Sequence, residues 1–350
     1  MPRLRRVDCS TAGIGRRRRG KGFEYSDAEG RPISDPELSE RIRDLAIPPA
    51  WRDVWVCPDQ WGHLQATGID AAGRKQYLYH ERWRERRERE KFEGMLAFAR
   101  ALPDMRRRVS RDLRGEELDR RRVLACAARL LDLGFFRIGS EDYAERNESY
   151  GLATMKKTHV SIEGDRIVFD YPAKSGQRRI QAVTDDKVRD IVAALKSRRG
   201  GADELLAYRE GRSWVDVRSA EINDYIKEVT HPNFSAKDFR TWNGTVLAAI
   251  ALAGGGRDAA TKTARKRAMT AAVREVSVYL GNTPAVCRAS YIDPRVFDRY
   301  LSGWTIAGAL DGVGGPEALG DAKARDTLQA AVVDLIRDDT ASEALEKVAA

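Results

Sequence analysis

Arginine, lysine and tyrosine are the side chains of this sequence with the greatest capacity for chemistry. The 350 residues include 62 Lys and Arg and 11 Tyr, but only four His and four Cys. Arginine presents a planar, permanently charged fork that binds phosphate oxygens, whereas lysine is a point donor whose pKa can shift for proton transfer. A tyrosine phenol can attack phosphorus and form a covalent ester. These residue types suit metal-free phosphoryl transfer, which needs a nucleophile, cations for the non-bridging oxygens and an acid for the leaving oxygen.

The charge balance predicts an anionic partner. The net charge is +9 at neutral pH, which favours nucleic acid. Residues 1–22 contain eight basic side chains against one acid, whereas residues 311–350 contain nine acids against four bases. We therefore expect the N-terminal stretch and the body of the chain, but not its C-terminal stretch, to contact nucleic acid.

Several classes of protein are disfavoured by what the sequence does not contain. Cys9, Cys57, Cys126 and Cys287 are scattered, which indicates neither a zinc site nor a disulfide framework. There is no Gly-x-x-x-x-Gly-Lys-Ser/Thr loop for a nucleotide and no acidic cluster with metal spacing. No apolar run reaches membrane-spanning length. We expect a cytoplasmic, nucleoid-associated protein that needs no cofactor or metal and no membrane.

Five short motifs follow one another along the chain, and each contains one residue suited to the chemistry described above. In chain order these residues are Arg137 in Phe-Phe-Arg-Ile-Gly-Ser, Lys174 in Tyr-Pro-Ala-Lys-Ser-Gly, Arg240 in Lys-Asp-Phe-Arg-Thr, Asn282 in Leu-Gly-Asn-Thr-Pro-Ala, and Tyr291 nine residues after Asn282. Each motif alone is weak, because an isolated Arg or Lys is most often a solvated charge. The order of the set is what makes it specific.

Taken together, the motifs resemble those of the type IB DNA topoisomerases of poxviruses and bacteria. The resemblance spans most of residues 35–305. It implies that Arg137 and Arg240 are the catalytic arginines. It further implies that Lys174, on the turn of a hairpin, is the general acid and that Tyr291 is the nucleophile.

The sequence departs from this family at Asn282, where the family block has His. An imidazolium donates a charge-assisted hydrogen bond to phosphate, whereas a carboxamide donates a neutral one and cannot act as an acid or base. We expect Asn282 to hold a non-bridging oxygen with reduced stabilisation. Acid catalysis then depends on Lys174, with a possible contribution from Arg137.

The same resemblance implies further DNA contacts outside the catalytic set. Gln76, Tyr77 and Tyr79 lie in a segment similar to the strand that poxvirus-type enzymes place in the major groove. Tyr143 matches a phosphate-contacting Tyr of the family. The family's two domains close around the duplex as a clamp, so we expect the same arrangement here.

The N-terminal basic run is open to two interpretations. Arg16, Arg17, Arg18 and Arg19 form either a basic arm that lies along DNA phosphates or a disordered tail that adds solubility. We favour the arm.

The pattern of apolar residues predicts the elements that must position these side chains. Short alternating runs at 55–57 and 76–80 indicate strands, and helical spacing begins at Glu81. A three-stranded meander is predicted over residues 159–183. Helices are predicted at 186–198, 220–229, 236–253 and 258–280, followed by a short helix that carries Tyr291 and an amphipathic segment at 326–338.

These elements predict an α+β protein of three parts. Residues 1–85 are expected to form a small β-sheet domain that clamps DNA and bears the basic arm. Residues 86–310 are expected to form a larger, mainly helical catalytic domain that contains the meander. Residues 311–350 are expected to form an acidic helical tail.

We therefore expect a monomeric type IB topoisomerase that relaxes supercoils through a 3′-phosphotyrosyl intermediate, without a protein partner. Two alternatives stay open. A tyrosine recombinase or integrase uses much the same catalytic set but works as a tetramer on paired sites. An architectural DNA-binding protein would keep the fold without the chemistry.

Overall fold

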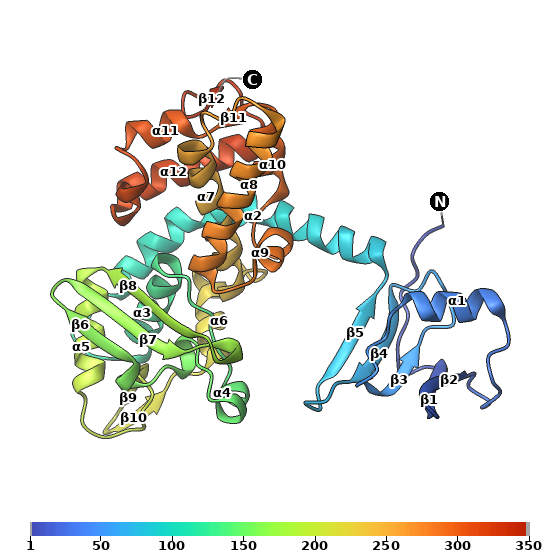
Figure 1. Cartoon of the computed structure of the whole chain (residues 1–350). Coiled ribbons are helices and arrows are strands. Elements are labelled where there is room, and N and C mark those ends of the chain that lie inside the picture. Colours follow the sequence, from blue (N-terminus) through green and yellow to red (C-terminus); the bar gives the residue numbers. More distant parts are fainter. Residues whose placement is uncertain (1, 348–350) are drawn as a thin grey trace. The chain divides into compact units, whose positions relative to one another are not determined.

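The chain divides into two compact units. The computed structural model describes residues 2–347, apart from the side chains of Ser175 and Leu319 (Figure 1). The units are Met1–Phe92 and Glu93–Ala350. Their boundary falls within the long helix α2 (Glu81–Asp112), the same helix in which the sequence placed the end of the first domain. The first unit is built on a sheet and the second is mainly helical, which confirms the predicted α+β class.

The first unit is an antiparallel sheet with one short helix. The strand order is β2-β1-β3-β4-β5. The elements are β1 (Ile14–Arg19), β2 (Gly22–Ser26), α1 (Pro36–Asp44), β3 (Arg52–Val56), β4 (Leu64–Ile69) and β5 (Lys75–Tyr79). Ile14, Val54, Val56 and Ala66 are buried in its core together with Ile42 of α1. The helix therefore covers the sheet through its apolar side.

The basic run forms strand β1, so it is not a disordered tail, and its predicted contact with DNA phosphates stays a prediction. Arg16 explains why a run of four arginines can be a strand. Its guanidinium donates hydrogen bonds to the carbonyls of Ile47, Pro48 and Trp51 at 3.3, 3.1 and 2.6 Å. It also stacks on the Phe23 ring at 4.1 Å. These contacts inside the unit satisfy the cation.

Over its described residues, 93–347, the second unit combines helices with three small sheets. Its main sheet has the order β6-β7-β8, which confirms the predicted meander. The strands are β6 (Val160–Glu163), β7 (Arg166–Pro172), β8 (Arg178–Thr184), β9 (Ala207–Glu210), β10 (Ser213–Asp216), β11 (Trp304–Thr305) and β12 (Glu346–Lys347). The helices are α3 (Arg120–Leu133), α4 (Glu141–Asn147), α5 (Asp186–Ser197), α6 (Ser219–Val229), α7 (Ala236–Gly255), α8 (Lys262–Leu280), α9 (Pro284–Ser290), α10 (Pro294–Leu301), α11 (Ala307–Gly312) and α12 (Ala322–Arg337). Four short 3₁₀ helices complete it: η1 (Leu152–Thr154), η2 (Lys157–His159), η3 (Lys174–Gly176) and η4 (Pro316–Gly320).

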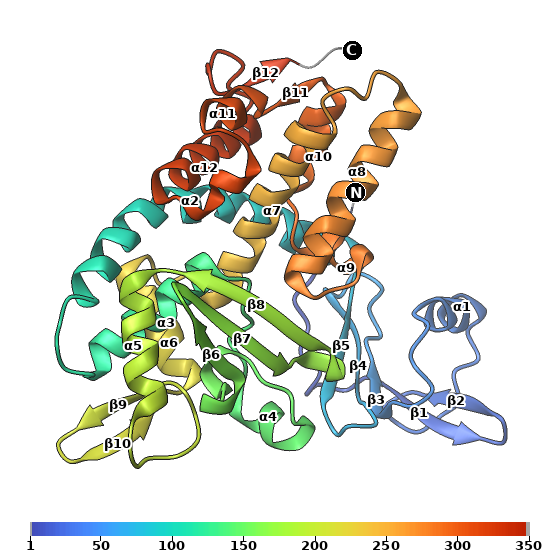
Figure 2. The same ribbon diagram turned by 60° about the vertical axis from the view of Figure 1, so that its left-hand side comes forward.

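Helix α7 is the central element of the second unit. It packs against α8, α11 and α12, as Figure 2 shows. Most residues from Ala236 to Ala253 are buried, because a helix that is apolar on all sides must be covered on all sides. No helix in the described part of the chain is both long enough and apolar enough to cross a membrane.

The residues expected to form an acidic tail lie within the second unit. Helix α12 buries Leu328, Val332 and Leu335 and packs against α7 and α10. Strand β12 then pairs with β11. Most charges of this segment face solvent, with Arg325 as the buried exception, while its apolar stripe contributes to the core.

Candidate active site

Two guanidinium groups converge on one amide oxygen in the second unit. Arg137 Nη2 donates to Oδ1 of Asn282 at 3.0 Å, and Arg240 Nη2 donates to the same oxygen at 2.7 Å. Arg137 Nη2 also donates to the carbonyl of Gly281 at 2.7 Å, and Arg240 Nη2 to that of Leu280 at 2.8 Å. Arg137 therefore lies beside Asn282, although the two residues are 145 positions apart in the sequence.

Within the described part of the chain, no carboxylate neutralises the positive charge of these two arginines. Among residues 2–347, no acidic side chain forms an ion pair with Arg137 or Arg240, and no group of three or more His, Cys, Asp or Glu could hold a metal ion. Burial, together with the charge of Arg137, lowers the pKa of Arg240 to about 10. Within the described residues these two cations have carbonyl, amide and phenol partners but no carboxylate, because Arg240 also shares a hydrogen bond with Tyr291. Such a site favours an anion.

Arg240 is fixed by the first turns of α7. The backbone N–H of Ser235 donates to the carboxylate of Asp238 at 2.8 Å, which closes the start of the helix. Arg240 is only 4% exposed, and its Nη1 donates to the carbonyl of Phe135 at 2.5 Å. This last bond ties α7 to the loop that carries Arg137.

The loop of Arg137 depends on a close approach of two glycines. Gly139 has φ +83°, a conformation that favours glycine. A Cβ atom on Gly151 would lie 2.4 Å from the Cα of Gly139. The backbone N–H of Leu152 donates to the carbonyl of Arg137 at 2.8 Å. The segment around η1 therefore supports the Arg137 backbone directly.

Arg179 is a structural partner of the site that the sequence did not reveal. It extends from β8 and donates through Nη1 to the carbonyl of Val278 at 2.7 Å and through Nη2 to that of Tyr279 at 2.5 Å. These carbonyls lie at the end of α8, just before Gly281, which caps the helix at φ +57° and whose N–H also donates to the Val278 carbonyl at 3.2 Å. Arg179 thereby holds the turn that presents Asn282. No local motif marks it, because its partners lie about 100 residues away.

Tyr291 lies beside the two arginines, directly after the last residue of α9. Its backbone N–H donates to the carbonyl of Cys287 at 2.9 Å. The guanidinium carbon of Arg240 lies 5.2 Å from the centre of the Tyr291 ring. A Cβ atom on Gly244 would lie 2.7 Å from the Tyr291 carbonyl oxygen, so glycine at this position lets α7 approach the tyrosine backbone. Sequence reasoning gave Gly244 no role.

A second phenol faces the same positive charges. Tyr171 of β7 shares a hydrogen bond with Arg179 and feels the charges of Arg137 and Arg240, yet burial raises its pKa. It is only 4% exposed. Tyr291 is partly exposed, so of these two phenols it is the one available to a phosphate.

Two predicted site residues lie apart from the cluster. Lys174 is exposed on η3, in the turn between β7 and β8, and within the described residues its ammonium makes no hydrogen bond or ion pair. Tyr143 is half-buried on α4, where its carbonyl accepts a hydrogen bond from Asn147 Nδ2 at 2.9 Å. The structure thus unites Arg137, Arg240, Asn282 and Tyr291 but not Lys174.

In the first unit, two of the predicted DNA contacts form an exposed aromatic pair. Tyr77 and Tyr79 are 45% and 41% exposed on the edge strand β5. Their rings stack with centroids 6.1 Å apart. Gln76 alternates to the other face, where its Nε2 donates to Asp70 at 2.8 Å. The prediction that all three contact DNA remains to be tested, and the two tyrosines are the more accessible.

The four arginines of β1 are not equivalent. Arg17 and Arg19 pair with Glu24 at 2.9 and 2.5 Å, and exposed pairs of this kind contribute little stability. Arg18 is exposed and has no ion pair in the part of the chain that the structure describes. The Arg16 guanidinium already donates hydrogen bonds to three backbone carbonyls of its own unit. Arg17, Arg18 and Arg19 therefore remain available to a phosphate backbone.

Comparison with known proteins places the chain in a family. Residues 80–301 match the family described as eukaryotic DNA topoisomerase I, catalytic core. Residues 22–70 match bacterial DNA topoisomerase IB, N-terminal domain. The first match includes every residue of the predicted catalytic set.

Viral proteins are similar over most of their length. DNA topoisomerase 1B of Acanthamoeba polyphaga mimivirus is 31% identical over 295 residues, which are 82% of this chain and 87% of that protein. DNA topoisomerase 1B of vaccinia virus (strain Copenhagen) is 20% identical over 272 residues, 76% of this chain and 83% of that protein. The fold and these matches define a DNA topoisomerase. The chain belongs to the type IB family, and its N-terminal domain is of the bacterial kind.

Proposed function

We propose that this enzyme relaxes supercoiled DNA by cutting and resealing one strand through Tyr291. The phenolic oxygen attacks a backbone phosphorus, the bond from phosphorus to the 5′ oxygen breaks, and a 3′-phosphotyrosyl ester and a free 5′-hydroxyl result. Supercoils relax by rotation of the free end. The observation that carries this proposal is the pair of unneutralised guanidinium groups beside a partly exposed phenol.

The arginines stabilise the charge that develops at phosphorus. Arg137 and Arg240 donate to the two non-bridging oxygens, whose charge is greatest in the pentacoordinate transition state. In the free enzyme, one N–H group of each arginine donates to Oδ1 of Asn282 instead. When the phosphate takes over the arginine donors, the Asn282 amide can turn its N–H groups toward the same oxygens.

Lys174 supplies the proton for the leaving 5′ oxygen. Its place on the exposed turn between β7 and β8 lets the ammonium reach a bound strand without displacing any partner. We propose that the turn moves toward the phosphate when DNA binds. The phenolic proton leaves to solvent as phosphorus is attacked, because no His or carboxylate among the described residues bonds the Tyr291 hydroxyl.

Resealing reverses these steps and requires no ATP. The phosphotyrosyl ester retains the free energy of the broken phosphodiester, so the 5′-hydroxyl can attack it directly. The arginines, the amide and the lysine act in both directions, and no step draws on a metal ion.

The first unit contributes binding. We propose that Tyr77 and Tyr79 contact bases or sugars while Arg17, Arg18 and Arg19 contact phosphates. We propose that the enzyme acts as a monomer, because all five residues of the predicted catalytic set lie on one chain, and that it works in the cytoplasm, on the nucleoid.

Relaxation of plasmid DNA tests this function. With supercoiled plasmid, EDTA and no ATP, we expect complete relaxation at less than one enzyme per plasmid. A need for added Mg²⁺ or ATP would contradict the proposal. Activity only on plasmids with paired sites would indicate a recombinase, and DNA binding without any change of linking number would indicate an architectural protein.

Replacing Asn282 tests the role of the amide. Asn282→His is expected to cleave at least as fast as the wild type, because an imidazole can accept from one guanidinium and donate a stronger hydrogen bond to phosphate. Asn282→Leu keeps the approximate size and should lose about tenfold to a hundredfold in single-turnover cleavage, since one hydrogen-bonding group is removed. A hundredfold loss in the His variant, or none in the Leu variant, would refute this role.

A further inference from the structure

A cavity within the second unit adjoins the residues around Arg240. Its volume is about 350 Å³, which is in the range of small-molecule sites. Residues of α3, α7, β8, α8, η4 and α12 line it. Phe135 belongs to its wall and also accepts the hydrogen bond of Arg240. The cavity and the proposed phosphate site therefore share a residue.

Arg325 is the unusual member of this cavity. It lies in the first turn of α12, lines the cavity and is only 8% exposed. Its Nε is buried without a hydrogen-bond partner. Within residues 2–347, its guanidinium makes no hydrogen bond and no ion pair. A buried cation without partners is costly, so this position favours an anion.

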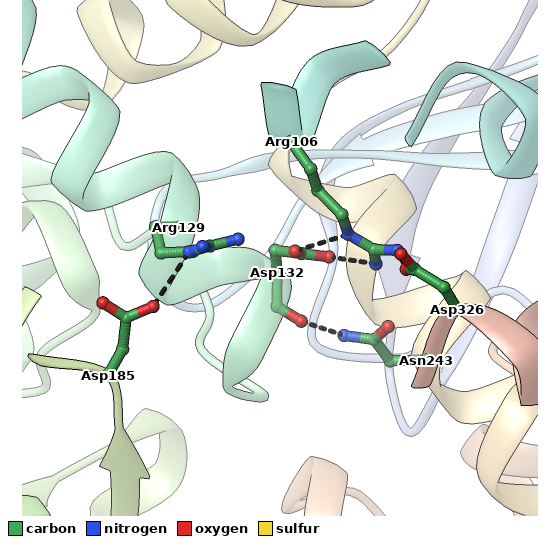
Figure 3. Close-up of polar contacts among 6 residues, drawn as sticks. All are labelled: Arg106, Arg129, Asp132, Asp185, Asn243 and Asp326. Carbon is green, nitrogen blue, oxygen red and sulfur yellow. Dashed lines mark hydrogen bonds and ion pairs between the residues drawn. The ribbon is translucent and has the colours of Figure 1, made fainter. Parts of the chain in front are cut away.

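The carboxylate that attracts Arg325 most, that of Asp132, already accepts hydrogen bonds from another arginine. Both oxygens of Asp132 accept hydrogen bonds from Arg106, at 2.8 and 2.7 Å. Arg106 donates a further bond to Asp326 at 2.5 Å, and Figure 3 shows this chain of ion pairs. Burial lowers the pKa of the Arg325 guanidinium. The charges of Asp132 and Asp326 act in the opposite direction, and the charge of Arg106 adds to the lowering.

The carboxylate of Asp185 also pairs with an arginine other than Arg325. Arg129 pairs with Asp185 at 3.0 Å (Figure 3), so that carboxylate is also committed. The positive charge of Arg129 repels Arg325. Among the residues that the structure describes, no carboxylate therefore pairs with Arg325.

Two amides and an apolar wall complete the cavity. Asn243 and Gln329 both line it and are 8% and 7% exposed. The only hydrogen bond of the Asn243 side chain within the described chain is a long one, 3.4 Å, from Nδ2 to the Asp132 carbonyl. Gln329 follows Arg325 by one helical turn on α12, so the two side chains share a face. The remaining lining is largely apolar and includes Leu133, Val246, Leu247 and Val183.

We infer that this cavity binds a small organic anion, with a carboxylate on Arg325 and an apolar body against the opposite wall. The guanidinium fork fits a carboxylate in two-point geometry. The amides of Asn243 and Gln329 add orienting hydrogen bonds. The apolar residues favour an aromatic or branched body over an inorganic ion.

Calorimetric titration of the full chain tests the inference with three probes of known chemistry. Benzoate is expected to bind saturably at one site. Benzyl alcohol, which has the same ring and no charge, should bind at least tenfold more weakly, because it lacks the charged hydrogen bonds. Inorganic phosphate should displace bound benzoate only at concentrations at least tenfold higher than benzoate itself requires, because it lacks the ring. Equal competition by phosphate would overturn the organic class, and no saturable binding of benzoate would overturn the site.

Variants on one helix locate the charge. Arg325→Gln is expected to lose benzoate affinity by tenfold or more, whereas Arg337→Gln, an exposed position on the same helix, should bind as the wild type does. In the absence of benzoate, Arg325→Gln should melt no lower than the wild type, because an unpaired buried charge is removed. Unchanged affinity in Arg325→Gln would overturn the proposal.

A measurement on the unmodified protein checks the location independently. Saturating benzoate should shift the methyl resonances of Leu133, Val246 and Leu247 more than those of the first unit's Ile14 and Val56, which lie in its core. Shifts confined to other residues would place the ligand elsewhere and contradict the inference. None of these tests depends on DNA cleavage, so their outcome is separate from that of the proposed function.

Discussion

Tyr291→Phe is expected to bind DNA with unchanged salt dependence and to form no covalent adduct. The substitution removes a single oxygen, the proposed nucleophile, and leaves the ring that lies 5.2 Å from the Arg240 guanidinium. The phosphate contacts that determine the salt dependence are not changed. Denaturing gels of the protein with nicked, labelled duplex provide the measurement. Supercoil relaxation should vanish together with the adduct.

Tyr171→Phe is the matched control for this loss. Its phenol feels the same arginines but is 4% exposed, so it cannot attack a bound strand. We expect this variant to form the adduct. An adduct in Tyr291→Phe, or its disappearance only in Tyr171→Phe, would assign the nucleophile to another residue.

Arg137→Ala is expected to reduce single-turnover cleavage by about a hundredfold to a thousandfold, the usual effect of removing one donor from a site that stabilises an oxyanion. Arg137 is partly exposed and its partners are the Gly281 carbonyl and the Asn282 amide. Its loss therefore disturbs the fold less than the loss of the buried Arg240 would. DNA binding should weaken only slightly.

A lysine at position 137 distinguishes the effect of charge from the effect of the planar guanidinium. Arg137→Lys keeps the positive charge but loses the planar fork, so we expect only partial recovery of the cleavage rate. Arg189→Ala on α5, whose guanidinium pairs with Asp186 and Asp190, serves as the control and should cleave at the wild-type rate. Full activity in Arg137→Ala would remove this residue from the mechanism.

The fold was predictable where local patterns dominate. The meander of β6, β7 and β8 follows from turn residues between alternating runs, and α7 and α8 follow from long helical periodicity. Strand β1 was not predictable in this way. Its arginines resemble a solvated run in sequence, and only the carbonyls of Ile47, Pro48 and Trp51, about 30 residues away, explain the burial of Arg16.

The candidate site was predictable where chemistry and motif coincide. Arg137, Arg240, Asn282 and Tyr291 were each chosen from the sequence, and the structure brings them together. Arg179 and Gly244 were missed because their roles depend on the end of α8 and the backbone of Tyr291. Such contacts between distant segments leave no pattern in the neighbouring sequence.

Mass spectrometry of the trapped adduct tests the central claim most directly. After the DNA is trimmed by nuclease and the protein digested with trypsin, we expect the residual nucleotide on the peptide of residues 289–295, esterified through its 3′ phosphate to Tyr291. A nucleotide attached to any other residue, or linked through a 5′ phosphate, would contradict the account.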